Sequence, residues 1–183
     1  MGENLRWKKL EDKIVRKDRW VDFREATYRM PNGKTVAPFY HYTGRDFVVI
    51  AALDKQGKYI CVRQFRVGID EVTTEFPAGG IEAGETPLDA AKRELREETG
   101  SVAARWTDLG SLYANPTMGT SRAHCFLAED CETVTAQELD ETECVVYLHL
   151  GEEELRRAIE DGSFAQAVHL VLYYRVKELR EGR

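Results

Sequence analysis

Residues 79–100 constrain the fold more than any other stretch, because they join a glycine-rich turn to a helix whose two ends are marked in the sequence. Thr86 suits the N-cap, Pro87 suits the first helical position, and Asp89 can complete a capping box. Gly100 is placed to end the helix in the left-handed conformation. Apolar residues recur at helical spacing and predict one buried face: Leu88, Ala91 and Leu95.

A second face of the same helix carries three carboxylates. Glu94, Glu97 and Glu98 stand at positions i, i+3 and i+4, where like charges repel by a few tenths of a kcal/mol. Arg93 can pair with Glu97 but cannot neutralise all three. One interpretation is a solvated helix surface; the other is a site for a hard divalent cation, because Mg²⁺ takes oxygen ligands. The preceding glycine-rich segment favours the cation, since its backbone can approach the helix closely.

These residues resemble a known family motif. The stretch is similar to the Nudix box, Gly-x5-Glu-x7-Arg-Glu-U-x-Glu-Glu-x-Gly-U, where U is a bulky aliphatic residue. The fixed positions match in register: Gly79, Glu85, Arg93, Glu94, Leu95, Glu97, Glu98 and Gly100. The last position departs from the motif, because Ser101 stands there and Val102 follows. The resemblance implies an α/β/α sandwich with a mixed sheet.

The rest of the pattern predicts an α/β protein that starts with an N-terminal β-strand region. We expect residues 1–43 to form this region, which would dimerise, and residues 44–183 to form the Nudix hydrolase domain. Alternating or continuous apolar runs predict strands within 11–43 and at 47–53, 59–65, 72–76, 105–113, 122–127 and 144–150. Helices are expected at 152–160 and 164–179.

The resemblance also implies a metal site. Glu94 and Glu98 correspond to the principal ligands, and Glu97 supplies a third carboxylate for a further ion. The main-chain carbonyl of Ala78 completes the implied ligand set. Mg²⁺ is the expected ion, with Mn²⁺ as an alternative. Arg93 is expected to brace the loop and not to take part in the chemistry.

A general base must lie within hydrogen-bond reach of the attacking water. The family draws it from an acidic loop before a late strand, which corresponds here to Asp140-Glu141-Thr142-Glu143. Glu141 is the first candidate and Glu143 the second, with Glu97 as the alternative if neither serves. The competing interpretation is an ordinary solvated loop.

Four further residues are candidates for substrate binding. Arg66 has the planar fork that suits phosphate oxygens, and a surface ion pair is the alternative. Glu75 belongs to a phrase, Glu75–Gly79, that looks like the ADP-ribose pyrophosphatase branch. Trp20 could stack on a base across a dimer interface. Pro116 stands in a loop that reads Ser-Pro-Gly in typical ADP-ribose enzymes, and its departure from that pattern leaves room for other nucleotide sugars.

The resemblance implies Mg²⁺-dependent hydrolysis of a nucleoside diphosphate sugar such as ADP-ribose, giving a nucleoside monophosphate and a sugar phosphate. The alternatives are a nucleoside triphosphate or dinucleoside polyphosphate pyrophosphatase, or a non-catalytic ADP-ribose sensor. The net charge of −6 argues against a nonspecific nucleic-acid surface. No apolar run approaches the ~20 residues of a membrane helix, and no secretory signal stands at the start, so neither a membrane nor nucleic acid is expected as a partner. Scattered cysteines without a C-x-x-C pair favour free thiols and a cytoplasmic location. The strands within residues 11–43, which the core sheet does not need, predict a homodimer.

Overall fold

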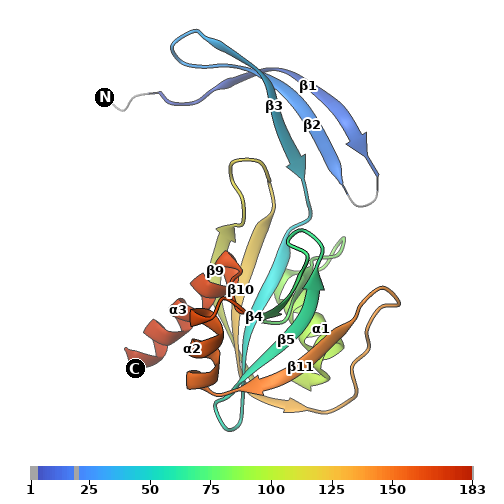
Figure 1. Ribbon diagram of the computed structural model, residues 1–183, viewed down its shortest axis with the longest axis vertical. Coiled ribbons are helices and arrows are strands. Elements are labelled where there is room, and N and C mark those ends of the chain that lie inside the picture. The colour runs from blue at the N-terminus through green and yellow to red at the C-terminus, as the bar shows by residue number, and fades with distance from the viewer. Residues whose placement is uncertain (1–3, 19–20, 183) are drawn as a thin grey trace. The chain divides into compact units, whose positions relative to one another are not determined.

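The computed structural model describes residues 4–18 and 21–182 (Figure 1). The chain divides into two compact units. One comprises the chain up to Arg45 together with Tyr113–Ser121, and the other comprises Asp46–Leu112 together with the chain from Arg122 onward.

The first unit is a three-stranded antiparallel sheet in the order β1-β2-β3, formed by Lys8–Lys17, Asp22–Arg29 and Thr35–Thr43. The predicted turn after β2 is present, because the Met30 N–H donates to the Lys34 carbonyl at 2.8 Å. Trp7, Tyr28 and Phe39 pack edge to face on this sheet. The segment Tyr113–Ser121 joins it through Tyr42, whose N–H donates to the Met118 carbonyl at 2.8 Å.

The second unit is built on a mixed sheet. Its main path runs β11-β5-β4-β10-β8; in addition β6 pairs with β5, β7 with β4 and β9 with β10. The strands are β4 Phe47–Asp54, β5 Tyr59–Arg66, β6 Glu71–Glu75, β7 Ala78–Gly80, β8 Ser101–Val102, β9 Arg105–Tyr113, β10 Arg122–Thr133 and β11 Val145–Leu150. The sheet is mixed because β10 runs parallel to β4 while β5 runs antiparallel to it.

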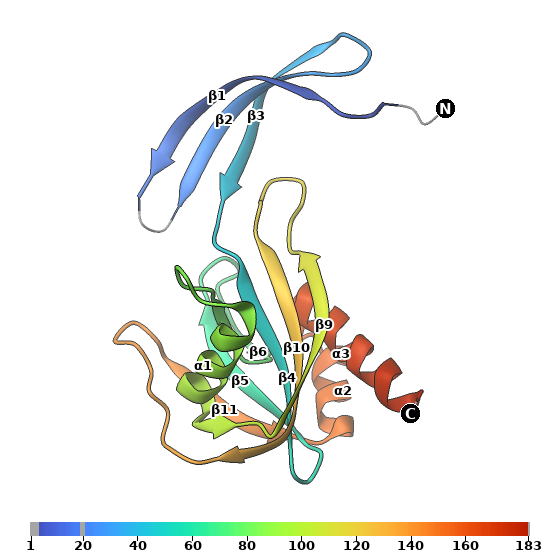
Figure 2. The ribbon, with the colours of Figure 1, turned by 180° about the vertical axis from the view of Figure 1, so that it is seen from behind.

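Strand β4 explains why helices cover both faces of this sheet. Successive side chains of a strand point to opposite faces. Val49, Ala51 and Leu53 belong to the core with α2 (Glu152–Glu160) and α3 (Ala167–Glu181). Their neighbours in sequence belong to the core with α1 (Pro87–Thr99), namely Val48, Ile50 and Ala52. In Figure 1, α2 and α3 lie in front of the sheet. Figure 2 shows the molecule from behind, and there α1 lies in front of the opposite face of the sheet. The predicted α/β/α sandwich with a preceding β region is confirmed.

The predicted element boundaries were wrong at several points. Strand β10 continues to Thr133, past the expected end at 127, because Cys131 is buried in the core and pairs with Asp54 of β4. The start of the acidic stretch is therefore strand. The short strands β7 and β8 carry no alternating pattern long enough to predict. Among the described residues, no helix combines the length and apolar composition needed to span a bilayer.

Candidate active site

Helix α1 begins and ends where the sequence predicts. Thr86 Oγ1 accepts a hydrogen bond from the Asp89 N–H at 3.2 Å and donates to Asp89 Oδ2 at 2.6 Å. Gly100 has φ 66°, and its N–H donates to the Arg96 carbonyl at 2.8 Å. A Cβ at Gly100 would lie 2.0 Å from the Thr135 carbonyl oxygen, so only glycine fits this C-terminus. Both ends of the helix that carries the carboxylates are thus fixed locally.

Two of the three helix carboxylates are buried. Glu94 is 9% exposed and Glu98 is 4% exposed. Burial raises the pKa of both groups, that of Glu98 to about 8. The Ala78 N–H donates to Glu98 Oε2 at 3.0 Å and opposes part of this rise, whereas the charge of Glu94 adds to it. Burial of two neighbouring carboxylates therefore disfavours the ionised form of each.

Gly79 lies directly against one of these carboxylates. A Cβ at this position would come within 2.1 Å of the Glu94 carboxyl carbon. Any side chain here would therefore displace the carboxylate from the backbone of β7. This close approach gives a physical reason for glycine at the start of the motif.

Glu97 has a different environment from its neighbours on the helix. Its side chain is 37% exposed, and Arg93 Nη1 donates to its Oε2 at 3.0 Å. The same nitrogen bonds Glu94 Oε1 at 2.7 Å. The rest of the guanidinium faces the loop, with Nε bonded to Glu85 Oε1 and Nη2 to the Gly80 carbonyl, both at 2.9 Å. Arg93 and Glu85 therefore brace the glycine-rich loop against the helix.

The oxygen atoms of Glu94 and Glu98 fit a hard divalent cation, although fewer carboxylates gather at one point than the sequence suggests. Among the residues that the structure describes, no group of three or more His, Cys, Asp or Glu side chains gathers closely enough to hold one ion. The carboxylates of Glu94 and Glu98 each lie beside the Ala78–Gly79 backbone. These are ligands that Mg²⁺ prefers, and a cation would relieve the cost of burying their charge.

The segment after β10 runs along the C-terminal end of α1. Gln137 Nε2 donates to the Glu98 carbonyl at 2.6 Å and to the Val145 carbonyl at 3.2 Å. The Glu138 N–H donates to the Glu97 carbonyl at 2.9 Å. These bonds fix the beginning of the acidic loop to the helix that carries the site.

The two candidate bases lie in the remainder of this loop. Glu143 accepts a hydrogen bond from the Asp140 N–H at 3.1 Å. Its charge is among the smaller causes that raise the pKa of Glu94 and Glu98. Glu141 is exposed in the turn.

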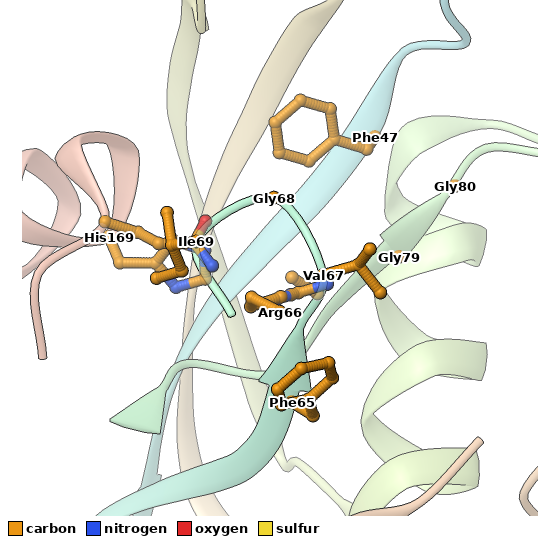
Figure 3. Close-up of a pocket in the computed structure, with 11 residues that line it drawn as sticks. Phe47, Phe65, Arg66, Val67, Gly68, Ile69, Gly79, Gly80 and His169 are labelled. Carbon is orange, nitrogen blue, oxygen red and sulfur yellow. The ribbon is translucent and has the colours of Figure 1, made fainter. Parts of the chain in front are cut away.

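A pocket of about 710 Å³ adjoins the glycine-rich strand β7. Figure 3 shows Phe47 of β4, Phe65 of β5 and His169 of α3 lining it from three elements. Further lining residues are Arg66, Val67, Gly68, Ile69, Ala78, Gly79, Gly80 and Gln166. The pocket therefore combines apolar walls with a small number of polar groups, which is typical of ligand sites.

Arg66 and Glu75 form an ion pair beside this pocket. Arg66 Nε donates to Glu75 Oε1 at 2.8 Å, and Nη2 forms a second bond to Oε2. Glu75 is fully buried and also accepts a bond from Thr73. Burial opposes its ionisation, but the bonds from Arg66 and Thr73 outweigh it and hold the pKa of Glu75 below its ordinary value. Both predicted residues thus lie together, and Glu75 orients Arg66.

The remaining predicted residues lie elsewhere. Trp20 is outside the described residues. Pro116 is exposed and belongs to the unit that contains the N-terminal sheet. Sequence reasoning assigned nothing to His169, which lines the pocket. Its hydrogen-bond partner Phe76 is distant in sequence, and a single histidine on a helix has no spacing signal that could have identified it.

Comparison with known families decides the identity of this arrangement. A family model described as a NUDIX domain matches residues 43–169. The chain belongs to the Nudix family. The matched region contains the glycine-rich loop, α1, the acidic loop and every pocket residue from Phe47 to His169.

Individual relatives match nearly the whole chain. It is 32% identical over 180 residues to an ADP-ribose pyrophosphatase of Bacillus subtilis, covering 93% of this chain and 96% of the relative. It is 28% identical over 182 residues to a methanol dehydrogenase activator of Bacillus methanolicus, covering 97% of each. A crystal structure of an ADP compounds hydrolase has the same fold, with a TM-score of 0.87 over 99% of this chain and 98% of that one at 24% identity. The prediction of a Nudix hydrolase of the ADP-ribose pyrophosphatase branch is confirmed.

Proposed function

We propose that this Nudix protein hydrolyses the pyrophosphate bond of a nucleoside diphosphate sugar, ADP-ribose first, to a nucleoside monophosphate and a sugar phosphate. The observation that carries the proposal is the buried pair Glu94 and Glu98 against the Ala78–Gly79 backbone, beside a pocket that contains Arg66. The name of the Bacillus subtilis relative supports the substrate class.

Glu94, Glu98 and the Ala78 carbonyl would hold Mg²⁺ or Mn²⁺, with Glu97 available for a further ion. A bound divalent ion would offset the charge of the pyrophosphate and lower the pKa of a water molecule bound to it. The protein contributes a fixed helix, a glycine that admits the carboxylate, and Arg93, which holds the loop in place. Arg93 already neutralises part of Glu94 and Glu97, which leaves Glu98 as the carboxylate with the greatest need of a cation.

For the general base we propose Glu143, ahead of Glu141. Support comes from the influence of the Glu143 charge on the buried carboxylates, because a base must lie next to the metal-bound water without being a main ligand. Glu141 remains the second candidate, and Glu97 the third, since its carboxylate is partly exposed on the same helix.

For the phosphate groups we propose Arg66. Glu75 holds its Nε and Nη2, so Nη1 is left to donate to a phosphate oxygen in the pocket. Glu75 would then be a positioning residue. The roles of Trp20 in base stacking and of Pro116 in the substrate loop stay proposals from the sequence.

We also propose a cytoplasmic homodimer formed through the N-terminal sheet. Strand β1 is exposed along its whole length and carries the exposed apolar residues Leu10, Ile14 and Val15. An exposed edge strand with apolar side chains is a surface that proteins normally cover. The four cysteines are free thiols, which suits a reducing compartment.

A substrate panel tests the proposed function. The purified protein is mixed with ADP-ribose, ADP-glucose, ATP or diadenosine tetraphosphate, in Mg²⁺, Mn²⁺ or EDTA, and the products are separated by ion-exchange chromatography. We expect AMP from ADP-ribose, only with metal. Faster turnover of the triphosphate or of the dinucleoside polyphosphate would refute the substrate class, and tight binding of ADP-ribose without AMP would indicate a sensor.

A further inference from the structure

His169 lies on α3 and reaches the pocket that contains Arg66 (Figure 3). Its side chain is 2% exposed, and its ring packs against both Phe76 and Phe164 at centroid distances of 6.3 and 6.2 Å. The Phe76 N–H donates a hydrogen bond to His169 Nδ1 at 3.1 Å. Aromatic packing and this bond together fix the orientation of the imidazole. Neither the metal chemistry nor the Arg66–Glu75 pair uses it.

The bond to Phe76 determines which nitrogen carries the proton. A backbone N–H is always a donor, so Nδ1 is unprotonated and the neutral ring carries its proton on Nε2. Two charged side chains act on the ring in opposite senses, Glu75 favouring and Arg66 opposing a second proton. Burial outweighs both and lowers the pKa of His169 to about 4. Within the described part of the chain, no group hydrogen-bonds to Nε2.

We propose that His169 Nε2–H donates a hydrogen bond to a hydroxyl oxygen of the substrate's sugar and is a specificity-determining residue. This inference rests on the proposed function. His169 lines the pocket, so a ligand oxygen beside Nε2 would give this donor a partner that the protein itself does not provide. A site built to bond a hydroxyl discriminates against an analogue that lacks it, because the protein donor is then left unpaired.

The distribution of charge in the pocket favours a sugar hydroxyl over a phosphate as the partner. Arg66 provides a cation on the β5 side, next to the glycine-rich strand that leads to the metal residues. The α3 side offers the neutral imidazole of His169, and the amide of Gln166 lies just before that helix. A charged group followed by neutral polar groups matches a phosphate joined to a polyhydroxyl sugar. A triphosphate chain would instead place a second anion beside neutral donors.

Two substitutions separate the hydrogen bond from Phe76 to Nδ1 from the proposed hydrogen bond from Nε2 to the substrate. In His169→Asn the side-chain oxygen can replace Nδ1 and accept the Phe76 N–H, but no donor reaches the position of Nε2. In His169→Gln the amide can reach the position of Nε2, while the acceptor at Nδ1 is lost. We expect His169→Asn to raise KM for ADP-ribose roughly 3- to 10-fold, with a smaller change in kcat. His169→Gln should recover part of that loss.

Substrate analogues identify the partner atom. Each hydroxyl of the terminal ribose of ADP-ribose is removed in turn, and kcat/KM is measured for the wild type and His169→Asn. For one analogue the two proteins should become equal, because the bond is absent from both. The control is His149→Asn, which removes a histidine bonded to Asp54 outside the pocket and should keep the wild-type ranking of analogues.

A spectroscopic measurement keeps the test valid even if the variants unfold. In the wild type, the ¹⁵N signals of His169 should show the Nε2–H tautomer, and the Nε2 signal should shift when ADP-ribose binds in EDTA. If ADP-ribose is hydrolysed but His169→Asn lowers kcat/KM equally for every analogue, or the Nε2 signal does not move, the inference is overturned. If the wild type hydrolyses no nucleoside diphosphate sugar, the proposed function itself fails.

Discussion

Replacing Glu98 with glutamine should stabilise the metal-free protein while it abolishes activity. Burial raises the pKa of Glu98 to about 8, from 4.5 in the unfolded chain. Below pH 4.5 the carboxyl is protonated in both states and has no effect. As pH rises from 4.5 toward 8, the unfolded chain releases the proton and the folded protein retains it, so folding becomes progressively less favourable.

The size of this effect follows from the pKa difference. Each pKa unit corresponds to about 1.4 kcal/mol, so the metal-free wild type should lose about 3 kcal/mol by pH 7 and approach about 5 kcal/mol well above pH 8. Glu98→Gln has no proton to release and avoids this loss. Glutamine also keeps the shape of the side chain and can still accept the Ala78 N–H.

Urea denaturation in EDTA between pH 5 and pH 9 measures the prediction. The variant should exceed the wild type in free energy of unfolding at pH 8, and the two should converge near pH 5. Glu97→Gln is the matched control, because that side chain is more than a third exposed and paired with Arg93, and it should follow the pH slope of the wild type. Equal stability of Glu98→Gln and wild type at pH 8 would refute the reasoning. So would undiminished hydrolysis by Glu98→Gln at saturating Mg²⁺.

Three further outcomes are expected. Glu143→Gln should lower kcat about 10²- to 10⁴-fold with little change in metal affinity, and Glu141→Gln should have a smaller effect. Stopped assays of AMP release measure both rates. If Glu141→Gln is the slower enzyme, Glu141 and not Glu143 is the general base. Gly79→Ala should weaken Mn²⁺ binding at least tenfold in calorimetry because its Cβ displaces Glu94, whereas Gly80→Ala, whose Cβ meets nothing within 4 Å, should bind as the wild type does. Ile14→Lys should give a monomer in sedimentation at micromolar concentration, and a monomeric wild type would contradict the proposed dimer.

Local signals made α1 and the central strands predictable. Thr86 and Gly100 mark the helix ends through their own side chain and backbone, so no distant residue is needed to explain them. Strand β4 is apolar from Phe47 to Leu53, a continuous run that predicts burial on both faces. The end of β10 could not be predicted in the same way. Its last residues pair with β8 and β4, and these tertiary contacts override an acidic composition that favours a loop.

Chemical motifs predicted the site only where the residues are close in sequence. The register of the Nudix box placed Glu94 and Glu98 on one helix, and the structure adds that they are buried. The Arg66–Glu75 pair spans only two adjacent strands and could be suggested from the phrase around it. His169 meets Phe76 across 93 positions of sequence, so only the fold reveals that contact.

The three glutamates of the helix look equivalent in sequence, and the structure makes each of them different. Glu97 is partly exposed, and Arg93 takes up its charge. Glu94 shares the same guanidinium but lies against Gly79, so its position depends on a residue without a side chain. Among the described residues, the Glu98 carboxylate has only the Ala78 N–H as a hydrogen-bond partner, and it is almost fully buried. Because a cation gains most where the ionised form is least stable, metal binding should depend most on Glu98 and least on Glu97, and proton release from Glu98 should make the affinity rise with pH.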